Sequence, residues 1–187
     1  MGVPMARQSL AEFLAWEEHQ VDRYEFYRGE VFAMVGGTAR HNRVIMNLGS
    51  RIADHLDGTG CQVFSENMKV QVDEGILYPD VVVTCGKAEA GDEQIITDPK
   101  LIIEVLSPST MKIDLGDKAA DYLQLPTLAG YLIFAQDEVK AWAYNRSGEK
   151  QFPPGPQVFA AADTAISIPA LNIEFPLADV YAGIEFD

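Results

Sequence analysis

The sequence predicts an α/β domain with a central mixed β-sheet that is flanked by helices and carries additional β-hairpins. Helical and extended patterns alternate along the chain, two strand patterns are apolar on both faces, and several short strands are joined by tight turns. A length of 187 residues suits one domain over 1–187, and 48% hydrophobic with 22% charged residues is ordinary for a globular protein.

The first third of the chain predicts a helix, a hairpin and a longer helix. Ser9 and Glu12 form a capping-box pattern, which opens a short helix to about residue 19. A hairpin follows over 24–34 and turns at an Arg-Gly pair. Thr38 can cap the longer helix, which is expected to run to about Leu56 with one apolar face before two glycines end it.

The rest of the chain predicts strands on either side of one further helix. Short strands at 62–64 and 68–72 precede two strongly apolar strands, at 78–83 and 101–106. A helix is expected over about 111–125, where Pro126 stops it. The remaining expected elements are a hairpin over 130–145, a stiff proline-rich loop at 153–156, strands at 165–168 and 171–175, and a short helix at 177–182.

Each of the two strongly apolar strands carries one carboxylate. Glu104 shares a face with Ile102 and Leu106, because alternate residues of a strand lie on the same face, and Asp80 precedes three valines. An ionised carboxylate in apolar surroundings costs several kcal/mol unless it is paired. If the strands are neighbours, the two acids can converge and hold Mg²⁺ or Mn²⁺, which prefer hard oxygen ligands. The alternative is that each acid is paired internally with Arg, Lys or backbone N–H groups.

The helix expected after the Glu104 strand carries Asp114, Lys118 and Tyr122 on one face, at i, i+4 and i+8. A helix that leads straight out of a strand can turn this face back toward the strand end. Lys118 could then place an ammonium group near both acids, where it would orient water or stabilise charge on a phosphorus centre. The alternative is a solvated Asp114–Lys118 pair, with Tyr122 in a packing role.

The order and spacing of these features resemble the Uma-type family of restriction-endonuclease-like proteins, within the PD-(D/E)XK nuclease superfamily. The resemblance covers about residues 8–145. Its matching residues are Tyr24-Glu25, Gly29-Glu30, His41, the segment Tyr78–Val83, the segment Leu101–Thr110, Asp114, Lys118 and Tyr122. The resemblance implies a restriction-endonuclease-like fold and Mg²⁺-dependent cleavage of DNA.

Carried over by position, the resemblance makes Asp80 and Glu104 the catalytic and metal-binding acids. The superfamily pattern places a lysine two residues after the second acid, where this chain has Leu106. Lys118, arriving from the following helix, is the natural substitute for that missing lysine.

Glu30 and His41 are further candidates for supporting roles, as are Asp114 and Tyr122. Glu30 precedes the long helix and could supply a third metal oxygen, or it is a solvated hairpin charge. His41 lies near the start of that helix and could touch a phosphate, or it is a surface histidine.

The net charge of −14 disfavours long-range attraction to a polyanion such as DNA. The nearest approach to a basic patch is formed by Arg40, Arg43, Arg51 and Lys69. A bound divalent cation would reverse the local sign of the potential, so a phosphodiesterase site is still compatible with this charge.

The two cysteines, Cys61 and Cys85, form no metal or redox motif and are expected to act as small apolar residues. No apolar run approaches the length of a membrane span, and the first residues lack the apolar centre of a signal peptide, so the cytoplasm is the expected location.

Three hypotheses about function follow. The first is a cytoplasmic endonuclease that depends on Mg²⁺ or Mn²⁺ and hydrolyses phosphodiester bonds of DNA, plausibly as a homodimer because double-strand cleavage needs two sites. The second is a catalytically inactive protein of the nuclease fold with a binding or regulatory role, which the acidic charge and Leu106 favour. The third is a self-associating protein that uses its hairpins, with Asp80 and Glu104 paired internally.

Overall fold

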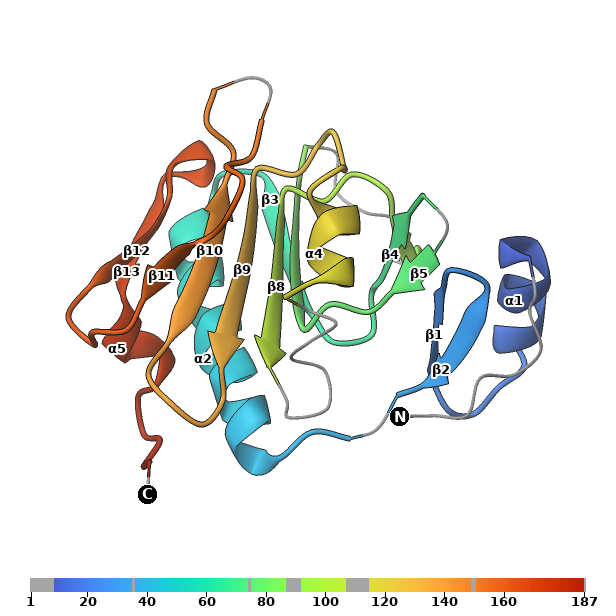
Figure 1. Ribbon diagram of the computed structural model, residues 1–187, viewed down its shortest axis with the longest axis horizontal. Coiled ribbons are helices and arrows are strands. Elements are labelled where there is room, and N and C mark those ends of the chain that lie inside the picture. Colours follow the sequence, from blue (N-terminus) through green and yellow to red (C-terminus); the bar gives the residue numbers. More distant parts are fainter. Residues whose placement is uncertain are drawn as a thin grey trace.

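The computed structural model describes residues 9–34, 36–73, 75–86, 92–106, 115–148 and 151–186, which form two mixed β-sheets with helices on their faces (Figure 1). The larger sheet has the order β11 (Gln157–Phe159), β10 (Ala141–Asn145), β9 (Gly130–Ala135), β8 (Leu101–Leu106), β6 (Val81–Cys85) and β3 (Cys61–Ser65). The smaller sheet has the order β2 (Glu30–Ala33), β1 (Tyr24–Tyr27), β5 (Gly75–Leu77), β4 (Lys69–Val72) and β7 (Ile95–Ile96). The other elements are α1 (Leu10–Glu17), α2 (Ala39–Leu56), α4 (Asp117–Tyr122), α5 (Leu177–Val180), the 3-10 turn Pro169–Leu171 and the ribbon of β12 (Ala165–Ile168) with β13 (Ile173–Pro176).

The sequence predicts one central mixed sheet, and the structure has two sheets that are both mixed. β8 and β9 are parallel in the larger sheet and β4 and β7 are parallel in the smaller one, whereas the other pairings are antiparallel. The parallel pair β8–β9 is joined through α4, which is the crossover that parallel neighbours require.

The two faces of the larger sheet are covered by different helices. Leu101, Ile103 and Val105 belong to the apolar cluster that includes the buried face of α2. Ile102 and Leu106 point to the opposite face and pack in the cluster that includes α4. Figure 1 shows α2 behind the strands and α4 in front of them. β8 is therefore buried on both faces, which explains its continuous apolar pattern.

The long helix forms where its sequence predicts it. Thr38 is the N-cap, and its hydroxyl accepts a hydrogen bond from the backbone N–H of His41 at 3.1 Å. The Thr38 hydroxyl also donates to Oε1 of the buried Gln136, directly after β9, at 2.7 Å. This bond fixes the start of α2 beside the ends of β8 and β9. The apolar face of the helix is buried as expected, through Val44, Ile45, Leu48, Ile52 and Leu56.

The first helix packs against the hairpin β1–β2, which forms one edge of the smaller sheet. The capping box of Ser9 and Glu12 is present, and Phe13 of α1 stacks on Phe26 of β1 with ring centroids 5.1 Å apart. The turn between β1 and β2 places Arg28 at φ 51° and Gly29 at φ 83°. Positive φ at both central residues is typical of the hairpin turn that matches strand twist.

Some predicted boundaries differ from the structure. α4 begins at Asp117, so the helix expected over 111–125 is described only over Asp117–Tyr122, and 107–114, including Asp114, lies outside the described residues. The short strands β5, β7 and β11 were not expected from the sequence. Each has three residues or fewer and exists through pairing with a longer neighbour, which a local pattern does not reveal.

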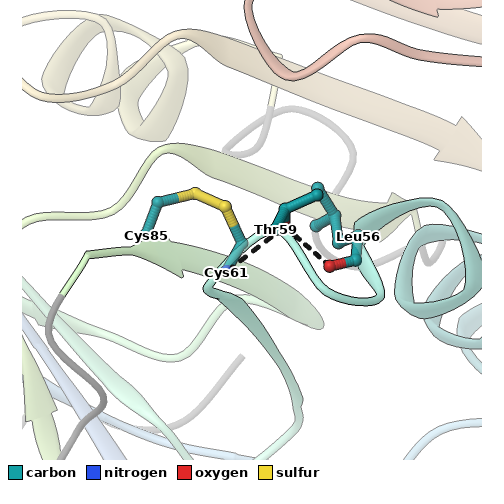
Figure 2. The surroundings of a disulfide bond; sticks show 4 residues. All are labelled: Leu56, Thr59, Cys61 and Cys85. Carbon is teal, nitrogen blue, oxygen red and sulfur yellow. Dashed lines mark hydrogen bonds between the residues drawn. A yellow bond between two sulfur atoms is a disulfide. The ribbon is translucent and has the colours of Figure 1, made fainter.

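The expectation that the cysteines act as small apolar residues is wrong, because Cys61 and Cys85 form a disulfide (Figure 2). The register of β3 and β6 places these two residues directly opposite each other, with a Cα–Cα distance of 4.0 Å. Thr59 supports the turn before β3: its hydroxyl donates to the Leu56 carbonyl at 2.6 Å and accepts from the Cys61 N–H at 3.3 Å. A disulfide is unusual in a reducing cytosol. The cytoplasmic location therefore stays a prediction, which the oxidation state of these cysteines in cells would test.

Among the described helices, none combines the length and the apolar character that crossing a bilayer requires.

We expect replacement of both cysteines by serine to lower the free energy of unfolding. The disulfide closes a loop between positions 24 apart, and closing a loop of this size stabilises a protein by about 3 kcal/mol, chiefly by restricting the unfolded chain. Urea unfolding of the wild type and of Cys61→Ser/Cys85→Ser measures the difference. Dithiothreitol should destabilise the wild type alone; equal stability of the wild type and the variant in the absence of reductant would contradict the expectation.

Candidate active site

The antiparallel register of β6 and β8 brings the two predicted acids together. Val81 pairs with Ile103 and Val82 with Ile102, so the register extended by one residue sets Asp80 opposite Glu104. Val82 and Ile102 both pack in the cluster on the α4 face, and alternation puts Asp80 and Glu104 on this same face. Directly opposite residues of an antiparallel pair have Cβ atoms about 5 Å apart. Two carboxylates therefore converge at the end of β8.

Asp80 is oriented by one contact to each of its oxygens. Its Oδ2 accepts a hydrogen bond from the backbone N–H of Val105 at 2.6 Å, and its Oδ1 lies 3.2 Å from Nε2 of His41. His41 stands in the first turn of α2, so the start of this helix borders the acid pair. The side chain of Asp80 is 16% exposed, which leaves the carboxylate accessible from solvent.

Glu104 is the more deeply buried acid, at 4% exposure. Its Oε1 accepts a hydrogen bond from the hydroxyl of Tyr122 at 3.1 Å and lies 3.6 Å from Nζ of Lys118. Lys118 and Tyr122 are one helical turn apart on α4 and both reach the same oxygen. Tyr122 is thus a hydrogen-bonding partner of the acid as well as a packing residue in the core.

Glu25 is a further acid of the site, to which the sequence reasoning gave no role. It stands on β1 of the smaller sheet, and its Oε1 accepts from Nζ of Lys118 at 2.9 Å and from the backbone N–H of Tyr78 at 3.1 Å. The Lys118 side chain is 7% exposed and lies between carboxylates from both sheets. The only hint in the sequence was the place of Tyr24-Glu25 among the residues of the family resemblance.

The turn between β1 and β2 forms ion pairs with α4. Arg28 lies 3.7 Å from a carboxylate oxygen of Asp117 and 3.6 Å from one of Asp121, both on α4. Tyr27, next to Arg28, packs against the cluster that contains α4, and its burial together with the neighbouring Asp121 carboxylate raises the pKa of its phenol. α4 is thus fixed by the hairpin as well as by the sheet it covers.

A second buried ion pair supports the Tyr78-Pro79-Asp80 segment. Lys69 of β4 donates to Oε2 of Glu17 at 2.6 Å, and the hydroxyl of Tyr78 donates to Oε1 of Glu17 at 2.7 Å. Burial and the adjacent Glu17 carboxylate raise the pKa of the Tyr78 phenol, so this hydroxyl keeps its proton and its donor role. The backbone of Tyr78 is therefore held by Glu25 and its side chain by Glu17.

The other predicted site residues have different places. Glu30 is half-buried at the turn end of β2 opposite Tyr27, and among the described residues it forms no ion pair. Asp114 lies outside the described residues. His41, by contrast, contacts Asp80 and is not a free surface histidine.

Three of the four cations considered as a basic patch have partners of their own. Lys69 is buried against Glu17, and Arg51 of α2 pairs with Asp179 of α5 at 3.1 Å. The guanidinium of Arg40 lies over the ring of Phe186, 5.6 Å from its centroid. Sequence separation hid these pairings, because each partner comes from a distant element.

The chemistry of the donor set fits a divalent cation of the Mg²⁺ type. Asp80 and Glu104 offer hard carboxylate oxygens at adjacent positions, and Mg²⁺ is commonly held by one or two carboxylates while it keeps several waters. In the part of the chain that the structure describes, no group of three or more His, Cys, Asp or Glu side chains is placed to hold a metal ion together, so the protein would supply only these two carboxylates.

Comparison with known proteins identifies relatives of this chain. A family model with the description “Putative restriction endonuclease”, Uma2, matches residues 10–178. The uncharacterized protein slr1290 of Synechocystis sp. is 30% identical over 185 residues, which is 98% of this chain and 96% of that protein. The uncharacterized protein sll1609 of the same organism is 31% identical over 146 residues, which is 76% of this chain and 82% of that protein.

A solved structure shares the fold. The crystal structure of a “putative nuclease belonging to DUF820” from Anabaena variabilis superimposes with a TM-score of 0.77, covering 94% of this chain and 98% of that one at 18% identity. The likeness confirms the predicted α/β fold, a mixed β-sheet flanked by helices.

We expect Lys69→Met to destabilise the protein substantially. The substitution leaves the Glu17 carboxylate buried with the Tyr78 hydroxyl as its remaining described donor, and breaking a buried ion pair from one side costs about 3–5 kcal/mol. Chemical unfolding measures the loss. Lys140→Met, which removes a half-exposed lysine that pairs with Glu138 and lies over the Trp142 ring, is the control and should cost under about 1 kcal/mol; similar losses in both variants would contradict this account.

Proposed function

This chain belongs to the Uma2 family, whose description is “Putative restriction endonuclease”, and we propose that it is an endonuclease that hydrolyses phosphodiester bonds of DNA with the help of Mg²⁺ or Mn²⁺. The observation that carries the proposal is the convergence of Asp80 and Glu104 on one face of the sheet, with the Lys118 ammonium 3.6 Å from Glu104.

Asp80 and Glu104 would hold the cation through their carboxylate oxygens. When bound, the cation would lower the pKa of a water ligand and neutralise charge on the phosphate. Asp80 is oriented by the Val105 N–H and by His41 before any cation binds, so its side chain would lose little conformational freedom on binding. Glu104 is oriented by Tyr122 and Lys118.

Lys118 would supply the positive charge that the superfamily pattern places two residues after the second acid. Leu106, which occupies that position, is buried in the core and offers no polar group. The Lys118 ammonium reaches the same acid from α4 and could donate a hydrogen bond to the attacking water or to a phosphate oxygen. An ammonium paired with carboxylates acts better as a donor than as a base, so we assign the proton-accepting role to another group or to solvent.

Because the net charge of −14 repels DNA at long range, binding would depend on positive electrostatic potential close to the site. The start of α2 borders Asp80 and carries Arg40, His41 and Arg43, and no acidic residue lies in its first turn. This end of the helix has positive polarity, which would favour phosphate near the acid pair. Cleavage of both strands would need two sites, and a homodimer would supply them.

A catalytically inactive nuclease fold with a binding or regulatory role is the second candidate. The observation in its favour is that Lys118 is already engaged by two carboxylates, while Leu106 replaces the usual lysine. Metal binding and cleavage, measured separately, discriminate the two candidates.

We expect millimolar Mn²⁺ or Mg²⁺ to raise the melting temperature of the wild type. A ligand that binds the native state alone stabilises it by about 2.7 kcal/mol at a hundred times its Kd. Asp80→Asn and Glu104→Gln should each abolish the shift, because each removes a charged ligand. Glu174→Gln, which removes the same charge from the exposed face of β13, should retain it. Absence of a shift in the wild type would count decisively against the metal site.

We expect the wild type to cleave plasmid or single-stranded DNA in the presence of Mn²⁺, and Lys118→Ala to be slower by about a hundredfold or more, since loss of one charged donor at a transition state has this magnitude. Gel analysis of the nicked and linear products measures the rates, and a melt of each variant verifies folding. If Lys118→Ala cuts as fast as the wild type, the role given to Lys118 is wrong. Metal binding without cleavage by the wild type would favour the inactive fold.

A further inference from the structure

An ion pair between Glu25 and Lys118 links the two sheets next to the acid pair formed by Asp80 and Glu104. Glu25 comes from β1 of the smaller sheet, Lys118 from α4, and Glu104 from β8 of the larger sheet. The ammonium of Lys118 is 2.9 Å from Oε1 of Glu25 and 3.6 Å from Oε1 of Glu104. The hydrogen bond to Glu25 is therefore the shorter of these two contacts.

We propose that Glu25 is a positioning residue of this site, which holds the charged ammonium of Lys118 beside Glu104. The consequence for catalysis rests on the proposed nuclease function, whereas the effect on Lys118 itself does not.

Glu25 is suited to this role because it is itself fixed. Its Oε1 also accepts the backbone N–H of Tyr78 at 3.1 Å, and Tyr78 is buried with its hydroxyl on Glu17. Tyr78 lies two residues before Asp80, so the segment that leads into the first acid of the pair also donates a hydrogen bond to Glu25. The Glu25 side chain is 17% exposed, and low exposure strengthens its charged hydrogen bond to Lys118.

Electrostatics explain why a further carboxylate is needed. Asp80 and Glu104 would share the charge of a divalent cation, and a cation at Glu104 would repel the nearby Lys118 ammonium. Glu25 provides a second opposite charge at hydrogen-bond distance from the Lys118 ammonium. With Glu25 in place, the Lys118 ammonium can keep its position beside Glu104 when the acid pair is occupied.

The experiment compares Glu25→Gln with the wild type and with Glu174→Gln. Glutamine keeps an acceptor oxygen for the Tyr78 N–H and removes the negative charge, while Glu174→Gln removes an equal charge from an exposed strand position. The rate of modification of Lys118 by an amine-reactive reagent is measured by peptide mass spectrometry, with the half-exposed Lys140 as internal reference. Cleavage of plasmid DNA in Mn²⁺ and the melting temperature are measured on the same samples.

We expect Glu25→Gln to raise the modification rate of Lys118 by about tenfold and to lower the cleavage rate by about tenfold or more, which corresponds to the loss of one charged hydrogen bond. In the Lys118→Ala background, Glu25→Gln should have no further effect on cleavage, because its role acts through Lys118. Glu174→Gln should resemble the wild type in both readouts. If Glu25→Gln does not fold, Glu25→Asp, which keeps the charge on a shorter side chain, is measured in its place with the same expected direction.

Failure of this inference and failure of the nuclease proposal give different results. Unchanged modification of Lys118 in the Glu25 variant overturns the positioning role, whether or not the wild type cuts DNA. Loss of cleavage without a change in Lys118 modification also overturns it, because Glu25 would then act by another route. Faster modification of Lys118 with no cleavage by the wild type supports the positioning role and counts against the nuclease.

Discussion

The antiparallel register between β6 and β8 is the constraint on which the candidate site depends. A shift of one residue would move Asp80 to the other face of the sheet, because successive side chains of a strand alternate between faces. Valines and isoleucines on both faces secure this register, since the α2 face and the α4 face of the sheet are each closed by apolar side chains. The hydrophobic core thus sets the relative position of Asp80 and Glu104. Their buried charges are costly in apolar surroundings unless other groups pair with them.

Those partners come from several other elements, of which α2 and the first hairpin are distant in the chain. Glu104 accepts a hydrogen bond from α4, and Asp80 contacts the first turn of α2 and the backbone of β8. Lys118 donates a hydrogen bond to the first hairpin. The site is therefore a junction of two sheets and two helices, in which each carboxylate has a hydrogen-bond donor. A junction of this kind keeps its geometry only while the hairpin stays docked on α4, which Arg28 promotes through Asp117 and Asp121.

The sequence predicted the parts of the molecule whose causes are local. Alternation and apolar runs identified β6 and β8, the capping residue Thr38 identified the start of α2, and the spacing of Lys118 and Tyr122 put both on one face of α4. The contribution of Glu25 depends on the pairing of β1 with β5, which no local pattern encodes. The disulfide was missed for a similar reason: Cys61 and Cys85 are adjacent only through the β3–β6 register.

The disulfide turns the segment from Cys61 to Cys85 into a covalent ring that contains β4, β5 and Asp80. A protease that cuts once inside this ring cannot separate the molecule into two pieces, because the cystine still joins them. The nicked protein would migrate as one chain on a non-reducing gel and as two after reduction. Cutting outside the ring would release a fragment under either condition, so partial digestion reports which of the peptide bonds around the Pro79-Asp80 turn are open to attack.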